Sequence, residues 1–567
     1  MLQNIAQYVS SAQANSSFFV PKTVDVLATT VVGDKRLVPS VAVLVAAATY
    51  AAYTLFKRLG QHRAPGPARL PILGNLLQMP SSLQFVKYAE WAQKFGNLYS
   101  LDILGQHIVV VSDHKGAIEL LERRAQIYTG RPRQVLVNEI LTQYMYMGFL
   151  QHGSLWSRMR RAAQGSFSAT GVRRFEPFQT RSAAQMAVLM MQHPEKLAKN
   201  LEIFAISSMY TSVYGRYIDI NSPIIGRAQK HIDHIMELTR PGIHIYEVFP
   251  ILKHVPAFLA RWKRDALAWH EQEDKFFKQL SLEAHADGFD KANAELNQRG
   301  FVAELIQTQD KHGLSEKEAS WLAGSMLGVG ADTTSVAVTN FFLAMTNFPE
   351  VMRKAQAELD TVIGQGRPPT FDDMPNLPYL RAVVKETLRW RPVAPLGMST
   401  LHAANADDHY EGYFIPKGKS TSIVRNENIL TYCILTDSIV VANIWAMNRD
   451  PTMYPDFDVF RPERFLDESG KNEVVPSGTH NMGHVTFGFG RRNCIGLHFA
   501  NQSLFIVMAT MLWAMDILPP IDENGKVVIP PTNQWRDDGI IVRPKPFDCR
   551  FVPRFPEAQA ILEASFA

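Results

Sequence analysis

The chain has 567 residues, of which 46% are hydrophobic and 10% aromatic, so it can bury a large core and is long enough for two or more ordinary domains. Its formal net charge of +4 is small for this length and argues against a nucleic-acid-binding protein. The three cysteines, Cys433, Cys494 and Cys549, are too few for a disulfide framework. They fit a reducing compartment in which one cysteine does chemistry.

The first predicted element is a transmembrane helix over residues 37–56. These 20 residues are uncharged and rich in Val, Leu and Ala, with charged residues at both ends. A helix of this length just spans the core of a bilayer. The core of a signal peptide is shorter, usually about 7–15 residues. A buried core helix is the other alternative, but the charges at both ends disfavour it. Residues 1–36 would then form a separate N-terminal segment.

A Pro-rich hinge and linker is predicted over residues 57–84, because the prolines of 64–75 fix φ and stop helix propagation. One large domain is expected from 85 to 567. Within it, alternating apolar residues over 97–112 predict a pair of strands. Helical patterns dominate over 115–390, and strands and loops follow. The prediction is therefore a mainly α domain with small β-sheets.

An apolar run from Trp321 to Ala344 predicts a buried helix. In its middle stands Val-Gly-Ala-Asp-Thr-Thr, residues 329–334. A glycine, an acid and two threonines are costly in a buried helix, and the hydroxyls of Thr333 and Thr334 can bond to carbonyls one turn earlier and distort it. Taken alone, the run indicates either a helix cap or polar helix face, or a local opening in the helix.

Two further pairings of side chains lie on predicted helices. Glu386 and Arg389 share one helix face, which taken alone is a common surface salt bridge. Trp156 and Arg160 also share a helix face, followed by Arg161, and taken alone indicate an exposed basic helix.

Residues 487–496 read Phe-Gly-Phe-Gly-Arg-Arg-Asn-Cys-Ile-Gly and are followed by a predicted helix, 497–512. The glycines allow tight turns and a close approach to a flat ligand. Backbone N–H groups and the helix N-terminus favour negative charge on the sulfur of Cys494, and Arg492 can pair with an anionic group of the ligand. The alternative is a buried structural cysteine beside a glycine-rich turn.

This segment resembles the haem-ligand loop of the cytochrome P450 superfamily, F-x-x-G-x-R-x-C-x-G. The fixed positions are filled by Phe487, Gly490, Arg492, Cys494 and Gly496. The resemblance implies haem b (iron protoporphyrin IX) as cofactor, with Cys494 as the axial thiolate of the iron and Arg492 paired with a propionate. Phe487 would pack near the sulfur. The resemblance covers about 65–553 and implies the cytochrome P450 fold, preceded by the N-terminal transmembrane helix.

Other motifs of the family occur in the same order. The family motif A/G-G-x-D/E-T-T/S is matched from Gly330 onward, with Val329 standing at its first place. This resemblance implies that Asp332 and Thr333 support proton delivery to dioxygen. By the same resemblance, further propionate partners would be Trp156, Arg160 and His402, although the proline expected just before His402 is missing. A buried network that supports the haem loop, with a structural role, would consist of Glu386, Arg389 and Arg464.

The resemblance implies a membrane-anchored haem-thiolate monooxygenase that takes electrons from NADPH–cytochrome P450 reductase and uses O2 to hydroxylate or epoxidise a hydrophobic small molecule. Residues 410–418, Tyr-Glu-Gly-Tyr-Phe-Ile-Pro-Lys-Gly, and residues 546–553, Pro-Phe-Asp-Cys-Arg-Phe-Val-Pro, resemble fungal microsomal members, in particular those like O-methylsterigmatocystin oxidoreductase. This similarity suggests secondary metabolism or xenobiotic oxidation. The single-pass protein would lie in the endoplasmic reticulum membrane with a cytosolic catalytic domain, and Asn15 would be a luminal glycosylation site. The alternatives are a haem-thiolate isomerase or dehydratase, and a haem-binding relic.

Residues 419–437 interrupt the family pattern. Their deletion joins Pro-Lys-Gly to Ser-Ile-Val-Val, which continues that pattern. The first residues can be encoded by a splice-donor string, and Leu435-Thr436-Asp437 by branch-like and acceptor-like strings. We interpret the segment as a retained in-frame intron of the gene model. The alternative is a genuine loop of this chain, which a hairpin tip would tolerate.

Overall fold

The computed structural model describes residues 62–240, 245–286, 300–396, 401–417, 438–477, 479 and 482–566. The chain divides into two units, Met1–Arg63 with Gly412–Phe414, and Ala64–Glu411 with Ile415–Ala567. Everything below concerns the second unit. The predicted transmembrane helix 37–56, Asn15 and the segment 419–437 lie outside the described residues.

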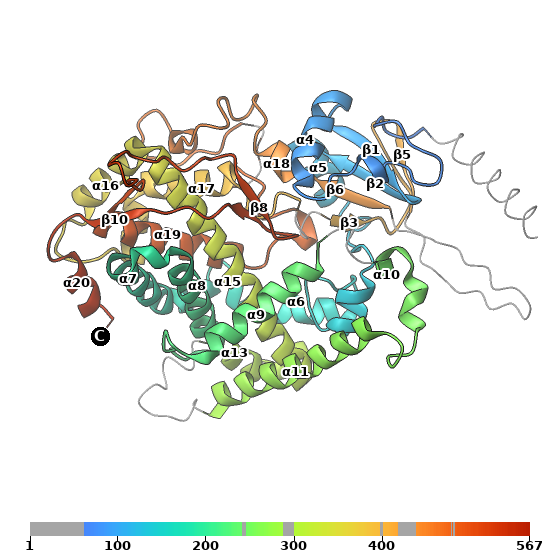
Figure 1. Cartoon of the computed structure of the whole chain (residues 1–567), viewed down its shortest axis with the longest axis horizontal. Helices are drawn as coiled ribbons and strands as arrows, with labels where there is room; N and C mark the ends of the chain where they lie inside the picture. The colour runs from blue at the N-terminus through green and yellow to red at the C-terminus, as the bar shows by residue number, and fades with distance from the viewer. Residues whose placement is uncertain are drawn as a thin grey trace, which may run out of the picture. The chain divides into compact units, whose positions relative to one another are not determined.

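Helices make up most of the second unit (Figure 1). Their bounds are α4 (Gln84–Phe95), α5 (His114–Ile118), α6 (Ser154–Phe167), α7 (Glu176–Gln192), α8 (Leu197–Tyr214), α9 (Pro223–Leu238), α10 (Ile245–Val248), α11 (Arg261–Ala286), α13 (Phe301–Gln307), α14 (Gln309–His312), α15 (Glu316–Asn347), α16 (Pro349–Val362), α17 (Pro378–Trp390), α18 (Ile444–Met447), α19 (Leu497–Ala514) and α20 (Ala558–Ala564). The expectation of a mainly α chain with small sheets is confirmed.

The strands form small sheets. They are β1 (Leu98–Ile103), β2 (Gln106–Val111), β3 (Leu401–Ala403), β4 (Asp408–Tyr410), β5 (Tyr413–Ile415), β6 (Ile439–Ala442), β7 (Met515–Leu518), β8 (Trp535–Asp537), β9 (Val542–Pro544) and β10 (Arg550–Pro553). The largest sheet has the order β1-β2-β6-β3, with β2 and β6 parallel and the other pairs antiparallel. The strand pair predicted over 97–112 is therefore confirmed as β1 and β2. Two-stranded antiparallel sheets join β7 to β10 and β8 to β9.

The Pro-rich stretch 64–75 belongs to the folded unit. The backbone N–H of Ser100 in β1 donates to the carbonyl of Pro65 at 2.7 Å, and that of Asn75 donates to Asp102 at 2.6 Å. Because β1 is an edge strand, the N–H and C=O groups on its outer side are unpaired in the sheet. An extended proline-rich segment can lie along that side and form hydrogen bonds with them. Gly66 allows the approach, since a Cβ there would lie 2.1 Å from the Ser100 carbonyl oxygen. The folded unit thus begins at Ala64, not at the predicted residue 85.

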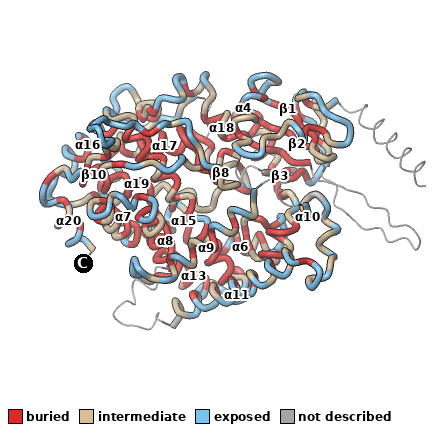
Figure 2. Tube along the Cα trace, in the orientation of Figure 1, coloured by how far each residue is buried: buried red, intermediate tan, exposed pale blue. Residues whose placement is uncertain are grey.

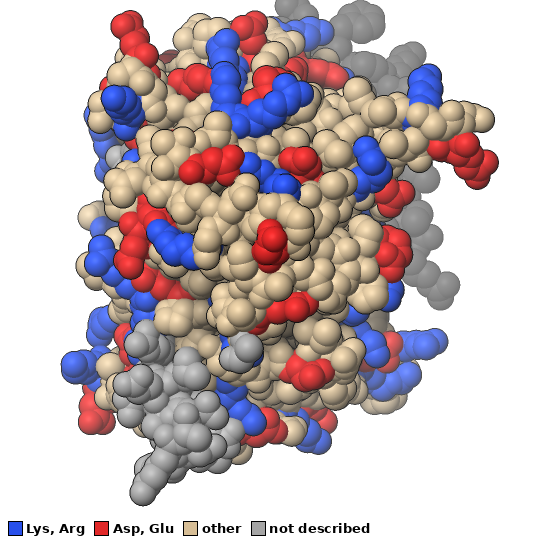
Figure 3. Space-filling model, turned by 90° about the vertical axis from the view of Figure 1, so that its left-hand side faces the viewer, with Lys and Arg blue, Asp and Glu red and all other residues tan. Residues whose placement is uncertain are grey.

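The core lies where α15 and α19 pack against α7 and α8 (Figure 2). The predicted buried helix 321–344 is α15, which extends over Glu316–Asn347 and begins with a capping box at Ser315 and Glu318. Of the described helices, only α19 has the length and apolar composition to cross a membrane, but most of its residues are buried in this core. On the face shown in Figure 3, basic and acidic side chains are interspersed.

Candidate active site

The loop that carries Cys494 is a tight turn held by backbone contacts. The N–H of Cys494 donates to the carbonyl of Phe487 at 2.8 Å, which closes the loop. Gly490 has φ +55°, and a Cβ there would lie 2.1 Å from the carbonyl oxygen of Leu121, so only glycine fits. Gly496 has an ordinary φ of −82° and immediately precedes α19. The N–H of Gly496, just before the helix, contacts the sulfur of Cys494.

The surroundings of the Cys494 thiol act on its pKa in opposite directions. Loss of water around the sulfur raises its pKa, while the N–H of Gly496 and the positive charge of Arg160 act to lower it. As a result, the sulfur is poorly hydrated but has a donor and a cation ready for its anionic form. Metal coordination would remove the proton outright. This is how a thiolate ligand is prepared, and the role of Cys494 as ligand stays a prediction.

Arg492 is buried and points away from the turn. Its Nε donates to the carbonyl of Thr129 at 2.8 Å, and its Nη2 donates to that of Leu150 at 2.9 Å. The guanidinium lies 4.4 Å from the ring centre of Trp156, a cation–π contact. The two residues predicted to share a helix face therefore make different contacts: Trp156 packs on Arg492, and Arg160 donates hydrogen bonds to the cysteine loop. Both terminal nitrogens of Arg160 donate to Asn493, at 2.8 Å and 2.6 Å.

Three arginines, Arg131, Arg160 and Arg492, form a cationic cluster beside Cys494. Burial, followed by repulsion from Arg160, lowers the pKa of Arg492 to about 10, and burial and repulsion from both neighbours also lower the pKa of Arg131. Among the described residues, neither Arg160 nor Arg492 makes a salt bridge with a carboxylate. Buried like charges repel one another, and an anion between them would compensate that repulsion. The cluster therefore fits a dianionic ligand such as haem with its two propionates.

His402 approaches this cluster from β3. Its Nδ1 lies 2.6 Å from the carbonyl oxygen of Tyr128, the residue before Thr129, whose carbonyl accepts from Arg492. A bridge between Gly130 and Ala403 ties the two segments together. The structure thus brings His402 to the segment that lines the arginine cluster, and its role toward a propionate stays a prediction.

Asp332 and Thr333 lie in α15, which packs against α19. The Oγ1 of Thr333 donates to the carbonyl of Val329 at 2.9 Å, and that of Thr334 to Gly330 at 2.7 Å. These are the predicted hydroxyl contacts one turn earlier. The helix is nevertheless α-helical throughout, because a carbonyl oxygen has a second lone pair for the hydroxyl. The expected local opening is therefore not seen as a break in α15.

Two side chains in this turn of α15 stand out, one by its exposure and the other by its unsatisfied carboxylate oxygen. Val329 retains 40% of its surface exposure in the middle of a largely buried helix, so this face accepts further apolar contact. Asp332 is buried and accepts from Arg543 Nη2 at 2.9 Å through its Oδ1. Its Oδ2 is buried without a hydrogen-bond partner among the described residues. Burial raises the pKa of Asp332 although Arg543 opposes that rise. Sequence reasoning missed Arg543, which lies far away in β9 and carries no local signal.

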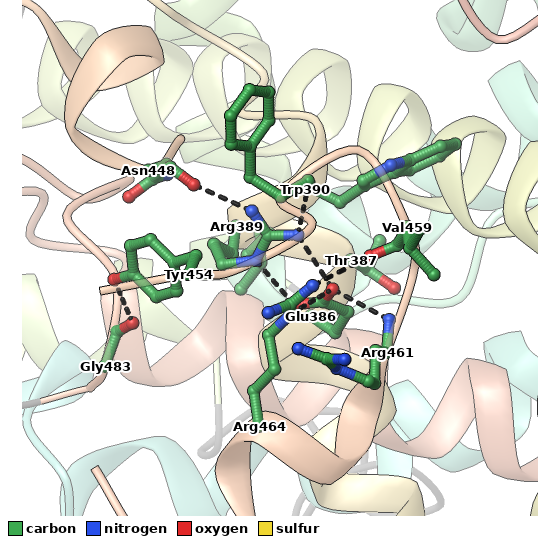
Figure 4. A network of polar contacts seen from close by, with 12 residues as sticks. Glu386, Thr387, Arg389, Trp390, Asn448, Tyr454, Val459, Arg461, Arg464 and Gly483 are labelled. Carbon is green, nitrogen blue, oxygen red and sulfur yellow. Dashed lines mark hydrogen bonds and ion pairs between the residues drawn. The ribbon is translucent and has the colours of Figure 1, made fainter. Parts of the chain in front are cut away.

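Glu386, Arg389 and Arg464 form the predicted network (Figure 4). Arg389 donates to both Glu386 oxygens, at 2.6 Å from Nε and 2.7 Å from Nη2. Oε1 also accepts from the Arg461 backbone N–H at 2.9 Å and from Arg464 Nε at 3.3 Å. Because the side chains of Glu386 and Arg389 are fully buried, their charges depend on one another.

A second set of residues, missed by sequence reasoning, connects this network to the cysteine loop. Arg389 Nη1 donates to the carbonyl of Asn448 at 2.7 Å, and the Asn448 side chain contacts the backbone of Val485 and the hydroxyl of Thr486. Tyr454 stacks under Arg389 and donates to the carbonyl of Gly483 at 2.6 Å. The network therefore holds the chain just before Phe487. Nothing in the local sequence marks Asn448 or Tyr454 as polar links.

We predict that Gly490→Ala destabilises the cysteine loop more than the same change at another left-handed glycine. Gly525 is the matched control, with φ +79° and no atom within 4 Å of an added Cβ. There, only the backbone conformation is strained, at about 1–2 kcal/mol. At Gly490 the Leu121 backbone must also move. Thermal denaturation should show a clearly larger fall in Tm for Gly490→Ala, and equal falls would contradict the argument.

A mainly α fold that presents a cysteine thiol beside buried, clustered arginines is the arrangement expected of a haem-thiolate protein. The family model for cytochrome P450 matches residues 64–424 and 422–551, most of the described unit. The chain therefore belongs to the cytochrome P450 family. The two matched stretches meet inside the segment 419–437.

The chain is similar to several curated fungal proteins. Cytochrome P450 monooxygenase 58 of Postia placenta is 41% identical over 505 residues, which cover 88% of this chain and 90% of the relative. Cytochrome P450 monooxygenase ARMGADRAFT_1018420 of Armillaria gallica is 38% identical over 88% of this chain and 91% of its own length. Cytochrome P450 monooxygenase iboC of Amanita muscaria is 32% identical over 89% and 94%. The predicted family and enzyme class, a cytochrome P450 monooxygenase, are confirmed.

Proposed function

We propose that the chain binds haem b through Cys494 and hydroxylates or epoxidises a hydrophobic small molecule. The observation that carries this proposal is the poorly hydrated thiol of Cys494 beside the cluster of Arg131, Arg160 and Arg492. When bound, haem supplies dioxygen activation: one oxygen atom enters the substrate, and the other becomes water with two electrons and two protons. The chain supplies ligation, proton access and exclusion of water.

Asp332 is suited to hold a proton for this reaction. Burial raises its pKa, and its Oδ2 has no partner among the described residues, so that oxygen can carry a proton. Arg543 joins it to Asp538 at 2.5 Å, and Asp538 contacts the more exposed Arg536 and Arg240. Arginine keeps its protons, so these ion pairs orient Asp332 and do not themselves carry a proton. We infer that Asp332 passes protons inward, with the Thr333 hydroxyl placed next to it on α15.

The electron donor that we propose is NADPH–cytochrome P450 reductase. The charged side chains that line a surface cleft beside the cysteine loop are Glu122, Arg123, Arg124 and Arg491. Arg123 and Arg124 pair with Glu119, whereas Arg491 has no carboxylate partner among the described residues. Arg491 is exposed, while its neighbour Arg492 faces the buried cluster. The exposed charge of Arg491 at this place favours encounter with an acidic protein surface. The site is thus suited to receive electrons close to Cys494.

We further propose that residues 37–56 anchor the chain in the endoplasmic reticulum membrane with the catalytic unit in the cytosol. Support comes from the length and charge flanks of that segment. The fungal sources of the relatives support a role in fungal secondary metabolism or xenobiotic oxidation.

Segment 419–437 stays a proposed retained intron, supported by the break in the family match. Amplified transcript lacking its codons is the expected result, and only full-length transcript would contradict it.

We expect the full chain, expressed in yeast and isolated with its membranes, to give a red-shifted thiolate Soret band in the reduced carbon monoxide difference spectrum. With a fungal reductase added, it should oxidise hydrophobic test compounds only when NADPH is present. A form lacking 419–437, measured in parallel, shows whether that segment disturbs haem binding. Absence of the band in both forms contradicts the haem-thiolate proposal. Product without NADPH would indicate an isomerase or dehydratase, and chain in the soluble fraction would contradict the anchor.

A further inference from the structure

Two buried polar side chains from separate elements converge on Gly328 in α15. A Cβ at this glycine would lie 3.5 Å from His231 Nε2 and 3.5 Å from the hydroxyl oxygen of Tyr146. His231 comes from α9, and Tyr146 from the segment between β2 and α6. Both are 2% exposed. Glycine therefore leaves a small space in which a donor and an acceptor face the helix together.

The orientation of the His231 ring is set by Glu273, on the side of Nδ1. Its Nδ1 lies 3.0 Å from Oε2 of Glu273, which is fully buried and also paired with Arg227. A carboxylate only accepts hydrogen bonds, so Nδ1 carries the hydrogen, and in the Nδ1–H tautomer Nε2 is an acceptor. Burial acts to raise the pKa of Glu273, but its contacts with His231 and Arg227 hold that pKa below its ordinary value.

The ring of His231 is fixed by aromatic neighbours. Trp269 stacks on it with ring centres 5.3 Å apart, and Phe277 meets it edge-on at 5.1 Å. Nevertheless, its Nε2 is buried with no hydrogen-bond partner among the described residues. The Tyr146 hydroxyl lies beside this nitrogen, since both atoms would be 3.5 Å from the same Cβ at Gly328. Leaving a buried polar group unsatisfied is costly, so such an oriented donor and acceptor pair indicates a binding function.

We propose that His231 and Tyr146 together bind a hydroxyl group of an otherwise apolar substrate. The substrate O–H donates to Nε2 of His231, and its oxygen accepts from the Tyr146 hydroxyl. The buried Tyr146 keeps its proton, since burial raises its pKa, and it therefore remains a donor. This inference rests on the proposed monooxygenase function and narrows its substrate class to apolar alcohols and phenols.

The place of this anchor along α15 has a consequence for the reaction. Gly328 precedes Thr333 by five residues, which correspond to about 7.5 Å along a helix axis. The exposed apolar side chain of Val329 lies between them in sequence. The two residues are also about 140° apart around the helix. The oxidised carbon is therefore several bonds away from the anchored hydroxyl.

The experiment measures binding to the purified, detergent-solubilised holoenzyme from Soret shifts. Two matched probe sets are used: dodecane, 1-dodecanol, its methyl ether and dodecanoic acid, and the corresponding four compounds built on decalin. An ether can still accept from Tyr146 but cannot donate to His231. We expect at least one alcohol to bind about tenfold more tightly than its ether, an effect of the size of one to two hydrogen bonds.

Four variants test the assignment. His231→Phe removes the acceptor but keeps a ring between Trp269 and Phe277, and Gly328→Ala fills the space while leaving His231 in place. Tyr146→Phe removes the donor. The matched control is His234→Phe, because His234 is on the same helix and also contacts Trp269, at 5.2 Å. The alcohol-to-ether preference should fall to within about twofold in His231→Phe and Gly328→Ala, and stay near tenfold in His234→Phe.

The reduced carbon monoxide spectrum of each sample separates this inference from the proposed function. When the thiolate band is normal, any of three results overturns the hydroxyl anchor. These are equal binding of alcohols and ethers, no Soret shift with any probe, or an alcohol-to-ether preference that persists in His231→Phe. Tightest binding of an acid would also overturn it, since two donors would then face the ligand. A missing thiolate band in the unaltered chain instead overturns the haem-thiolate function on which the anchor rests.

Discussion

Cys494→Ser is expected to abolish the red-shifted carbon monoxide band and reduce NADPH-dependent oxidation to background. The loop itself should survive, because the hydrogen bond that closes it comes from the backbone N–H of residue 494 to Phe487. What is lost is the thiolate, since a serine hydroxyl does not ionise at neutral pH, and a thiolate ligand is what favours O–O cleavage. The expected loss is therefore chemical, with little change in Tm of the haem-free protein.

Cys549→Ser is the matched control. Cys549 is the other described cysteine, buried next to β10, and burial raises the pKa of its thiol to about 12. No basic side chain is among the described groups that shift this pKa, so it is not prepared to ionise. The band and the turnover should persist in this variant. A thiolate band that persists in Cys494→Ser and disappears in Cys549→Ser would show that the ligand has been misassigned.

Features set by neighbouring residues were predictable. The cysteine loop is one contiguous stretch whose glycines and following helix could be read directly, and Gly490 does adopt the left-handed conformation that a tight turn requires. The strand pair β1 and β2 and the buried helix α15 follow from apolar spacing. In each case, the residues that determine the structure are close together in the sequence.

Features set by distant residues were not predictable from spacing. Arg131 reads as part of a polar loop, but the fold brings it to Arg160 and Arg492. Arg543 is 211 positions from Asp332, and no local pattern indicates that they pair. The stretch 64–75 reads as a linker because proline restricts local structure, whereas its contacts are with the edge of β1. Tertiary packing decides such contacts, and a single sequence does not record it.

Glu386→Gln is expected to cause the largest loss of stability among the described ion pairs. The introduced amide would keep the shape of the side chain but leave Arg389 and Arg464 without their carboxylate. Breaking one partner out of a fully buried pair costs about 3–5 kcal/mol, because the remaining charge stays buried without compensation. Since Arg389 also holds Asn448 and stacks on Tyr454, the loss should spread to the chain before Phe487 and lower the haem content.

Glu463→Gln is the control for that change. Glu463 lies next to Arg464, and its salt bridge to Lys354, at 2.6 Å, is between side chains that are 39% and 58% exposed. Exposed pairs contribute about 0–1 kcal/mol, so this variant should unfold close to the unaltered chain. Thermal denaturation and haem content per chain are measured for both. Equal Tm values in the two variants would mean that the buried Glu386 network contributes no more to stability than the exposed Glu463 pair. A low Tm with full haem content would mean that the network stabilises the fold but does not support the cysteine loop.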